Sequence, residues 1–140
     1  MIGLDTNVLA RYYTAASVKD DAVTAKQCNA ARELIEGGKR LMVSKTVLLE
    51  LEWVLRGIYH VGPTDMQEVF LHLLSLNQVD IEDRVAVQSA ATALGQGFDF
   101  ADALHHASYR TCNSVATFDD KGFVRRAKKA ALKPAVTLLK

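Results

Sequence analysis

The chain has 140 residues, enough for one domain with a buried core. Hydrophobic residues make up 49% and charged residues 24%, which is typical of a globular protein, and two prolines and eight glycines exclude a flexible linker or low-complexity arm. No apolar run reaches the roughly 18–20 residues that span a bilayer, and the first residues lack a secretory signal pattern. We therefore expect a single cytoplasmic domain over residues 1–140, without a membrane segment.

Charge is distributed unevenly along the chain. The net charge is +1, but residues 1–120 carry 10 Lys and Arg against 16 Asp and Glu, whereas residues 121–140 carry seven Lys and Arg and no acid. A basic segment beside an acidic body favours contact with a polyanion, and a solvated helix face is the alternative. The two cysteines, Cys28 and Cys112, are too few for a disulfide framework or a zinc site, and free thiols are the expectation.

In chain order, the first half alternates short apolar runs with helical patterns. Residues 2–4 predict a buried strand. Asp20 and Asp21 precede a helical pattern over residues 22–35, which Gly37 and Gly38 end. Residues 41–43 predict a second strand, followed by Ser44 as the N-cap of another helix. The predicted core face of that helix consists of Val47, Leu51, Val54, Leu55 and Ile58.

The second half continues the alternation. Thr64 and Gln67 match a capping box that predicts a helix to about residue 76. A strand at 79–81, a helix over 83–94 and a helix over 100–110 follow. The chain then predicts a strand at 115–117, a basic helix over 122–131 and a last strand at 135–139. Short strands alternating with helices predict an α/β fold with a mainly parallel central sheet flanked by helices.

Acidic side chains recur at positions where such a fold places its working site, beyond the carboxyl ends of the strands. Asp5 follows the first strand, and Asp119 follows the strand at 115–117. Glu50 lies at the edge of the core stripe of its helix, whereas Glu52 is expected to be better solvated. Asp102 lies in the first turn of a later helix. We expect these four carboxylates, Asp5, Glu50, Asp102 and Asp119, to converge.

Four gathered carboxylates would repel one another without a cation. Mg²⁺ and Mn²⁺ prefer oxygen ligands, lower the pKa of a bound water and stabilise charge on a phosphate. An acid-only site therefore points to phosphodiester hydrolysis. Each acid also has a simpler interpretation: Asp99 as an N-cap, Asp102 as a complement to the helix dipole, and Asp120 as a turn residue.

Four blocks of the sequence resemble the motifs of VapC-type toxins of the PIN-domain superfamily. They are MIGLDTNVLARY at 1–12, LLELEWVL at 48–55, DFADAL at 99–104 and ATFD at 116–119. Their order and spacing cover essentially the whole chain. The resemblance implies a three-layer PIN-like α/β fold and a Mg²⁺- or Mn²⁺-dependent endoribonuclease that is held inactive by a VapB-type antitoxin and forms homodimers. Its RNA target would be a structured RNA such as tRNA or ribosomal RNA.

Matched residue by residue, the resemblance implies that Asp5, Glu50, Asp102 and Asp119 are the catalytic metal ligands. It implies supporting roles, through contacts that orient the carboxylates or water, for Thr6, Asn7, Asp99 and Thr117. Assistance by Glu52, Asp99, Asp120 or His106 stays open. A contact between Asp102 and His106, four residues apart on a helix, would allow a histidine base instead of a metal-bound water.

Basic residues beside these motifs are candidates for contact with RNA phosphates or with an acidic antitoxin segment. They are Arg11, Arg125, Arg126, Lys128 and Lys129. The apolar surfaces of the helices at 21–35 and 46–58 are candidates for a dimer interface. Two other classes compete with the nuclease: a Mg²⁺-dependent phosphatase with Asp5 as nucleophile, which would want an Asp where Asn7 stands, and a catalytically inactive RNA- or protein-binding PIN module.

Overall fold

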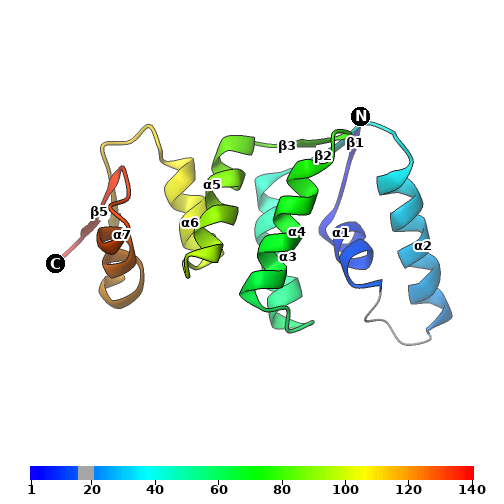
Figure 1. The fold of residues 1–140 in the computed structure, drawn as a ribbon, viewed down its shortest axis with the longest axis horizontal. Coiled ribbons are helices and arrows are strands. Elements are labelled where there is room, and N and C mark those ends of the chain that lie inside the picture. Colours follow the sequence, from blue (N-terminus) through cyan, green and yellow to red (C-terminus); the bar gives the residue numbers. More distant parts are fainter. Residues whose placement is uncertain (16–20) are drawn as a thin grey trace. The chain divides into compact units, whose positions relative to one another are not determined.

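The computed structural model describes residues 1–15 and 21–140, so Asp20 lies outside the described residues. The chain forms two compact units, unit 1 over Met1–Arg84 and unit 2 over Val85–Lys140. Each unit combines helices with parallel strands (Figure 1). The predicted α/β class and the parallel strand pairing are confirmed.

The sheet of unit 1 has three parallel strands in the order β1-β2-β3. They are β1 (Ile2–Gly3), β2 (Leu41–Val43) and β3 (Val79–Ile81). The predicted burial of the first strand is wrong, because β1 is an edge strand of this sheet and Ile2 is 39% exposed. Burial begins only at Leu4, whose N–H still donates to the Met42 carbonyl. This last contact fixes the direction in which the chain enters Asp5.

The described residues of unit 1 also form four helices. They are α1 (Thr6–Tyr13), α2 (Ala22–Glu36), α3 (Lys45–Gly57) and α4 (Pro63–Ser75), of which α4 packs against β3. Helix α1 was not predicted from the sequence; it contacts both α2 and α3 and lies between them (Figure 1). Ser44 is the N-cap of α3, as predicted, since its hydroxyl accepts from the Val47 N–H at 3.2 Å. The core of unit 1 includes Leu9, Ile35, Leu41, Leu48, Leu51, Leu55, Met66, Phe70, Leu73 and Val79.

Two local predictions in unit 1 are wrong. The capping box of α4 does not form: Gly62 is the N-cap without a side-chain hydrogen bond, and Pro63 begins the helix, so Thr64 already lies inside it. The core face of α3 is also rotated from its predicted position. Its buried residues are Leu48, Leu51, Glu52 and Leu55, whereas Ile58 is 59% exposed.

Unit 2 contains two helices followed by a two-stranded parallel sheet. Its elements are α5 (Arg84–Gly95, which begins at the unit boundary), α6 (Phe100–Ser108), β4 (Ser114–Thr117), η2 (Asp120–Val124), α7 (Arg125–Lys129) and β5 (Ala135–Leu138). The basic segment predicted as one helix over 122–131 is instead a π-helical turn, η2, followed by the short helix α7. A small core of Phe123, Val124, Ala127 and Val136 joins η2, α7 and β5.

His106 ties α6 to the strand end of unit 2. It is buried, its Nε2 donates to the Pro134 carbonyl at 2.7 Å, and its ring meets Phe123 edge to face. Because this ring nitrogen bonds the backbone beside β5, the side chain is positioned for packing. The geometry therefore favours a structural role for His106. It does not favour the alternative in which His106 contacts Asp102 and acts as a catalytic base.

Candidate active site

The acids singled out from the sequence fall into two groups, one in each unit. We call Asp5 and Glu50 the acid pair of unit 1, and Asp99, Asp102 and Asp119 the acid group of unit 2. Within the described residues, no three Asp, Glu, His or Cys side chains are already arranged to hold a metal ion. Each group is therefore described by itself.

The acid pair of unit 1 is built on the first turn of α1. Asp5 is the N-cap of this helix, and its Oδ1 accepts from the Thr6 N–H at 2.8 Å. Thr6 is 5% exposed, and its hydroxyl donates to Oε1 of Glu50 on α3. One buried threonine thus contacts both carboxylates, with its backbone and with its side chain. The orienting role of Thr6 stays a prediction, and these are the two contacts through which it would act.

Both carboxylates of the pair keep oxygens that could bind a cation. Within residues 1–15 and 21–140, neither Asp5 nor Glu50 forms an ion pair with Lys or Arg, and the structure shows no partner for Oδ2 of Asp5 or Oε2 of Glu50. They line a recess of about 270 Å³, to which Asn7 also contributes. Exposed, unpaired carboxylate oxygens are the donor set that Mg²⁺ and Mn²⁺ prefer, so these residues fit such an ion.

Glu52 differs sharply from Glu50. It is 5% exposed, and its carboxylate accepts hydrogen bonds from Arg56 one turn later, the shorter from Nε at 2.7 Å. The expectation that Glu52 is the better solvated of the two is wrong. The cause is the rotated core face of α3, which turns Glu52 inward and Glu50 outward. Because Arg56 already neutralises Glu52, Glu50 is the better candidate for metal binding.

In unit 2, backbone N–H groups hold two of the three acids. Asp99 is the N-cap of α6 and accepts from the Asp102 N–H at 3.1 Å, as its simpler interpretation predicted. Asp119 accepts from the N–H groups of Gly122 and Phe123, at 2.9 and 3.2 Å. Its own N–H donates to the Thr117 hydroxyl at 3.1 Å, so Thr117 contacts this acid.

Gly122 is a residue whose role the sequence analysis missed. A Cβ at this position would lie 2.9 Å from Oδ2 and 3.1 Å from Oδ1 of Asp119. The carboxylate can sit against the backbone of η2 only because residue 122 has no side chain. The cue available in the sequence was a glycine three residues after the acid of the ATFD block.

The charges of unit 2 act on one another at Asp102. Partial burial raises the pKa of Asp102 above its usual value, and the negative charges of Asp99 and Asp119 raise it further, while His105 and Arg126 oppose the shift. An added cation would relieve this repulsion. His105, which the sequence analysis did not single out, and not His106, is therefore the histidine whose charge acts on Asp102. Arg126 also approaches Gly97, with Nη1 3.8 Å from a Cβ built there.

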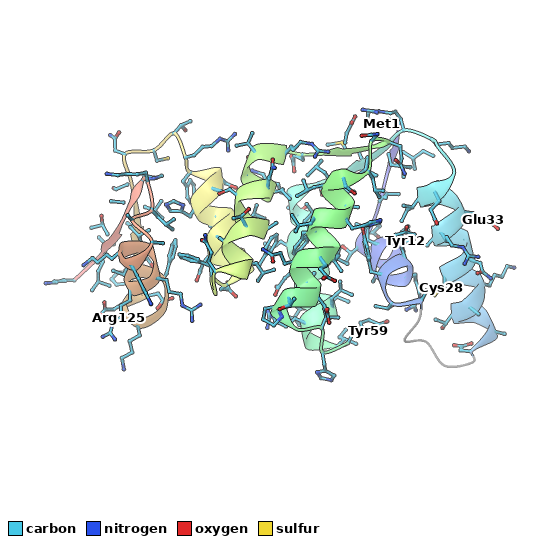
Figure 2. All side chains as sticks on the ribbon, viewed as in Figure 1. Met1, Tyr12, Cys28, Glu33, Tyr59 and Arg125 are labelled. Atoms are coloured by element: carbon cyan, nitrogen blue, oxygen red, sulfur yellow. The ribbon has the colours of Figure 1, made fainter. Side chains whose placement is uncertain are left out.

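The remaining basic candidates are exposed side chains of α7. Arg125 extends from this helix (Figure 2), and Lys128 and Lys129 are likewise exposed. The acid Asp120 is exposed and begins η2, consistent with a turn residue. No helix among the described residues is both long enough and apolar enough to cross a bilayer.

The fold and its acids define a small α/β protein in which Asp5, Asp102 and Asp119 lie at or near the start of a helix or helical turn and Glu50 lies within α3. Among the described residues, no Lys or Arg forms an ion pair with these candidate ligands. Among protein families, the PIN domain family matches residues 2–129 of the chain. The chain belongs to the PIN-domain family, whose members are generally nuclease modules. The predicted PIN-like α/β fold is thereby confirmed. No curated protein and no solved structure matches the chain.

Proposed function

We propose that this PIN domain is a Mg²⁺- or Mn²⁺-dependent endoribonuclease and the toxin of a type II toxin–antitoxin system of the VapBC kind. The observation that carries the proposal is the Asp5–Thr6–Glu50 arrangement. Two carboxylates from different helices share one buried threonine and have no cationic partner among the described residues. The family match supports the nuclease, and the resemblance of the four motif blocks to VapC toxins supports the toxin role.

We further propose that residues 1–140 form one domain in which Asp5, Glu50, Asp102 and Asp119 bind metal together. The family match spans both units, which supports this grouping. When bound, the metal would supply a hydroxide nucleophile and stabilise charge on the phosphate. The protein would contribute by holding its carboxylates in the orientation that binds the metal. Thr6 orients Glu50, and the backbone of η2 orients Asp119, so little reorganisation is needed when substrate arrives.

RNA and an antitoxin are the proposed partners. The exposed basic side chains of α7, Arg125, Arg126, Lys128 and Lys129, are suited to hold RNA phosphates without reading sequence, and substitution of the two arginines should weaken RNA binding in a salt-dependent way. A VapB-type antitoxin would cover the acidic residues. Exposed Trp53 on α3 and exposed Ile58 at its C-cap support a homodimer, because large apolar side chains at the surface favour burial against a second copy.

The test is cleavage of total cellular RNA by the purified protein, with Mg²⁺, with EDTA, and with Asp5→Asn. Asn caps a helix as well as Asp does, so the variant should fold normally while losing one charged metal ligand. We expect discrete fragments that require both the metal and Asp5, and sequencing of their ends identifies the target. Absence of cleavage by folded, antitoxin-free protein with either Mg²⁺ or Mn²⁺ would contradict the proposal and favour an inactive binding module.

A further inference from the structure

Arg11 lies on the same recess as the acid pair of unit 1, in the last turn of α1. Its guanidinium is held from two other parts of the unit. Nε donates to Oε1 of Gln27 on α2 at 2.9 Å, and Nη1 donates to the Tyr59 hydroxyl at 3.1 Å. Tyr59 follows the end of α3 (Figure 2). The guanidinium is therefore positioned by two hydrogen bonds and is not a freely rotating surface group.

The charge of Arg11 is left without a counterion. Both of its hydrogen-bond partners are neutral, and none of the ion pairs found among the described residues includes it. A guanidinium has five N–H donors, and these two bonds use two, so the Nη2 group keeps both of its donors. A fixed, uncompensated guanidinium with paired free donors matches the geometry of phosphate oxygens.

The position of Arg11 along α1 indicates which phosphate it would take. Two hydrogen bonds join α1 to α3 and the residues directly after it. Thr6 contacts Glu50, and Arg11 contacts Tyr59, which lies nine positions after Glu50. Arg11 lies five positions after Thr6, which corresponds to a rise of about 7–8 Å along the helix. Arg11 thus lies at the far end of the recess from the acids. A strand whose scissile phosphate is at Asp5 and Glu50 would bring a neighbouring phosphate towards Arg11.

We propose that Arg11, positioned by Gln27 and Tyr59, binds a backbone phosphate of the RNA strand adjacent to the phosphate that is cut. This inference rests on the proposed nuclease function and adds a binding position to it. The contact is made equally in the substrate complex and in the transition state. Its loss should therefore raise KM and leave kcat largely unchanged.

The direct test uses a fluorescein-labelled single-stranded RNA of mixed sequence, bound in EDTA so that no cleavage occurs, with affinity measured by anisotropy across a salt series. Arg11→Gln should weaken binding about tenfold and reduce the slope of log affinity against log salt by about 0.7, the value for one phosphate contact on a single strand. The RNA affinity of Arg11→Lys should lie between those of this variant and the wild type, because lysine keeps the positive charge but lacks the paired N–H donors of the guanidinium.

Two further variants separate phosphate binding from other effects. Arg32→Gln removes the same charge from an exposed arginine that bonds only Asn29 of its own helix among the contacts shown, and it should change affinity less than twofold. Gln27→Glu is nearly isosteric and supplies the missing counterion to Arg11. It should stabilise the fold or leave it unchanged, yet weaken RNA binding severalfold, because the guanidinium is then neutralised in place. A merely structural role for Arg11 predicts no loss in this variant.

The outcomes distinguish this inference from the function on which it rests. If the wild type cuts RNA in an Asp5-dependent way but Arg11→Gln and Arg32→Gln bind RNA equally well, the role of Arg11 is overturned and the nuclease stands. A fall in kcat at constant KM would also overturn it, by placing Arg11 at the scissile phosphate. Selective loss of binding to an acidic peptide, with RNA binding intact, would assign Arg11 to a protein partner. A wild type that neither binds nor cuts RNA overturns both proposals.

Discussion

The two acid-bearing units of this protein position their carboxylates by different means. In unit 1, Asp5 accepts from a backbone N–H at a helix start, but Glu50 depends on the side-chain hydroxyl of Thr6, which links two helices. In unit 2, Asp99 and Asp119 accept hydrogen bonds from the backbone at the start of a helix or helical turn. The difference indicates that unit 1 is sensitive to side-chain chemistry at one position, whereas unit 2 is sensitive to the path of its backbone.

The sharpest contrast within unit 1 is between Glu50 and Glu52. Glu50→Gln should reduce RNA cleavage about 10³-fold with little change in stability, because it removes a proposed metal ligand that has no cationic partner among the described residues. Glu52→Gln should retain activity but lower the free energy of unfolding by about 1–2 kcal/mol, since it weakens a charged hydrogen bond to Arg56. Cleavage rates and urea unfolding measure the two effects. The reverse pattern would show that Glu52 is the ligand.

The hydrogen bond from Thr6 to Glu50 can be removed by a substitution that keeps the shape of the Thr6 side chain. Thr6→Val removes the hydroxyl and should lower cleavage about 10–100-fold, as loss of a group that orients a metal ligand does, with a raised Mg²⁺ requirement. Thr6→Ser keeps the hydroxyl and should retain most of the activity. Rates measured across a Mg²⁺ titration test this prediction. Equal activity in the valine and serine variants would show that the contact with Glu50 does not matter for catalysis.

Unit 2 offers the matching test of backbone positioning. Gly122→Ala places a methyl group about 3 Å from both oxygens of Asp119, so the carboxylate or η2 must shift. We expect cleavage to fall about tenfold, as for other displaced metal ligands, with the fold retained by circular dichroism. Gly57→Ala is the matched control, since a Cβ at Gly57 meets nothing within 4 Å. Unchanged activity in Gly122→Ala would show that Asp119 tolerates another position.

The smallest expected effect concerns the charge of Asp102. Because burial and the neighbouring acids raise its pKa, the ionised form is disfavoured in the folded protein, and stability falls as pH rises through the window from the usual pKa to the raised one. Asp102→Asn removes this penalty. It should raise Tm at pH 7 in EDTA by about 1–2 °C, a small effect because the side chain is partly solvated. The gain should shrink towards pH 4 and on addition of Mg²⁺. An equal gain at both pH values would exclude a charge effect.

The sequence allowed the class of fold and the candidate acids to be predicted, but not their surroundings. Asp5 and Asp119 follow apolar runs that are plainly strands, so their place at strand ends could be inferred. The burial of Glu52 and the exposure of Glu50 could not be inferred. The reason is that the predicted core stripe of α3 was centred on Val47 and Ile58, away from buried Leu48. A shift of one position on a helix changes the facing direction by about 100°. Contacts between distant residues, such as Thr6 with Glu50, have no local pattern.

Helix α1 was missed for a related reason. The polar Asp5, Thr6 and Asn7 were interpreted only as residues at the end of the first strand, whereas Asp5 caps a helix that begins at Thr6. Asp5 ends the approach from β1 and caps α1 at the same time, so one residue serves two elements. This dual role places the carboxylate at a helix start, and the sequence pattern alone did not distinguish the two uses.

The central claim is that acids from both units act as one metal site, and a double-mutant cycle between Asp5→Asn and Asp119→Asn tests it most directly. Cleavage of one identified RNA would be measured at saturating Mg²⁺ for the wild type, both single variants and the double variant. If the acids act together, each single variant loses about 10³-fold in kcat/KM and the double variant loses little more, since the site is already broken. Losses that multiply, or an Asp119→Asn variant as active as the wild type, would contradict a shared site.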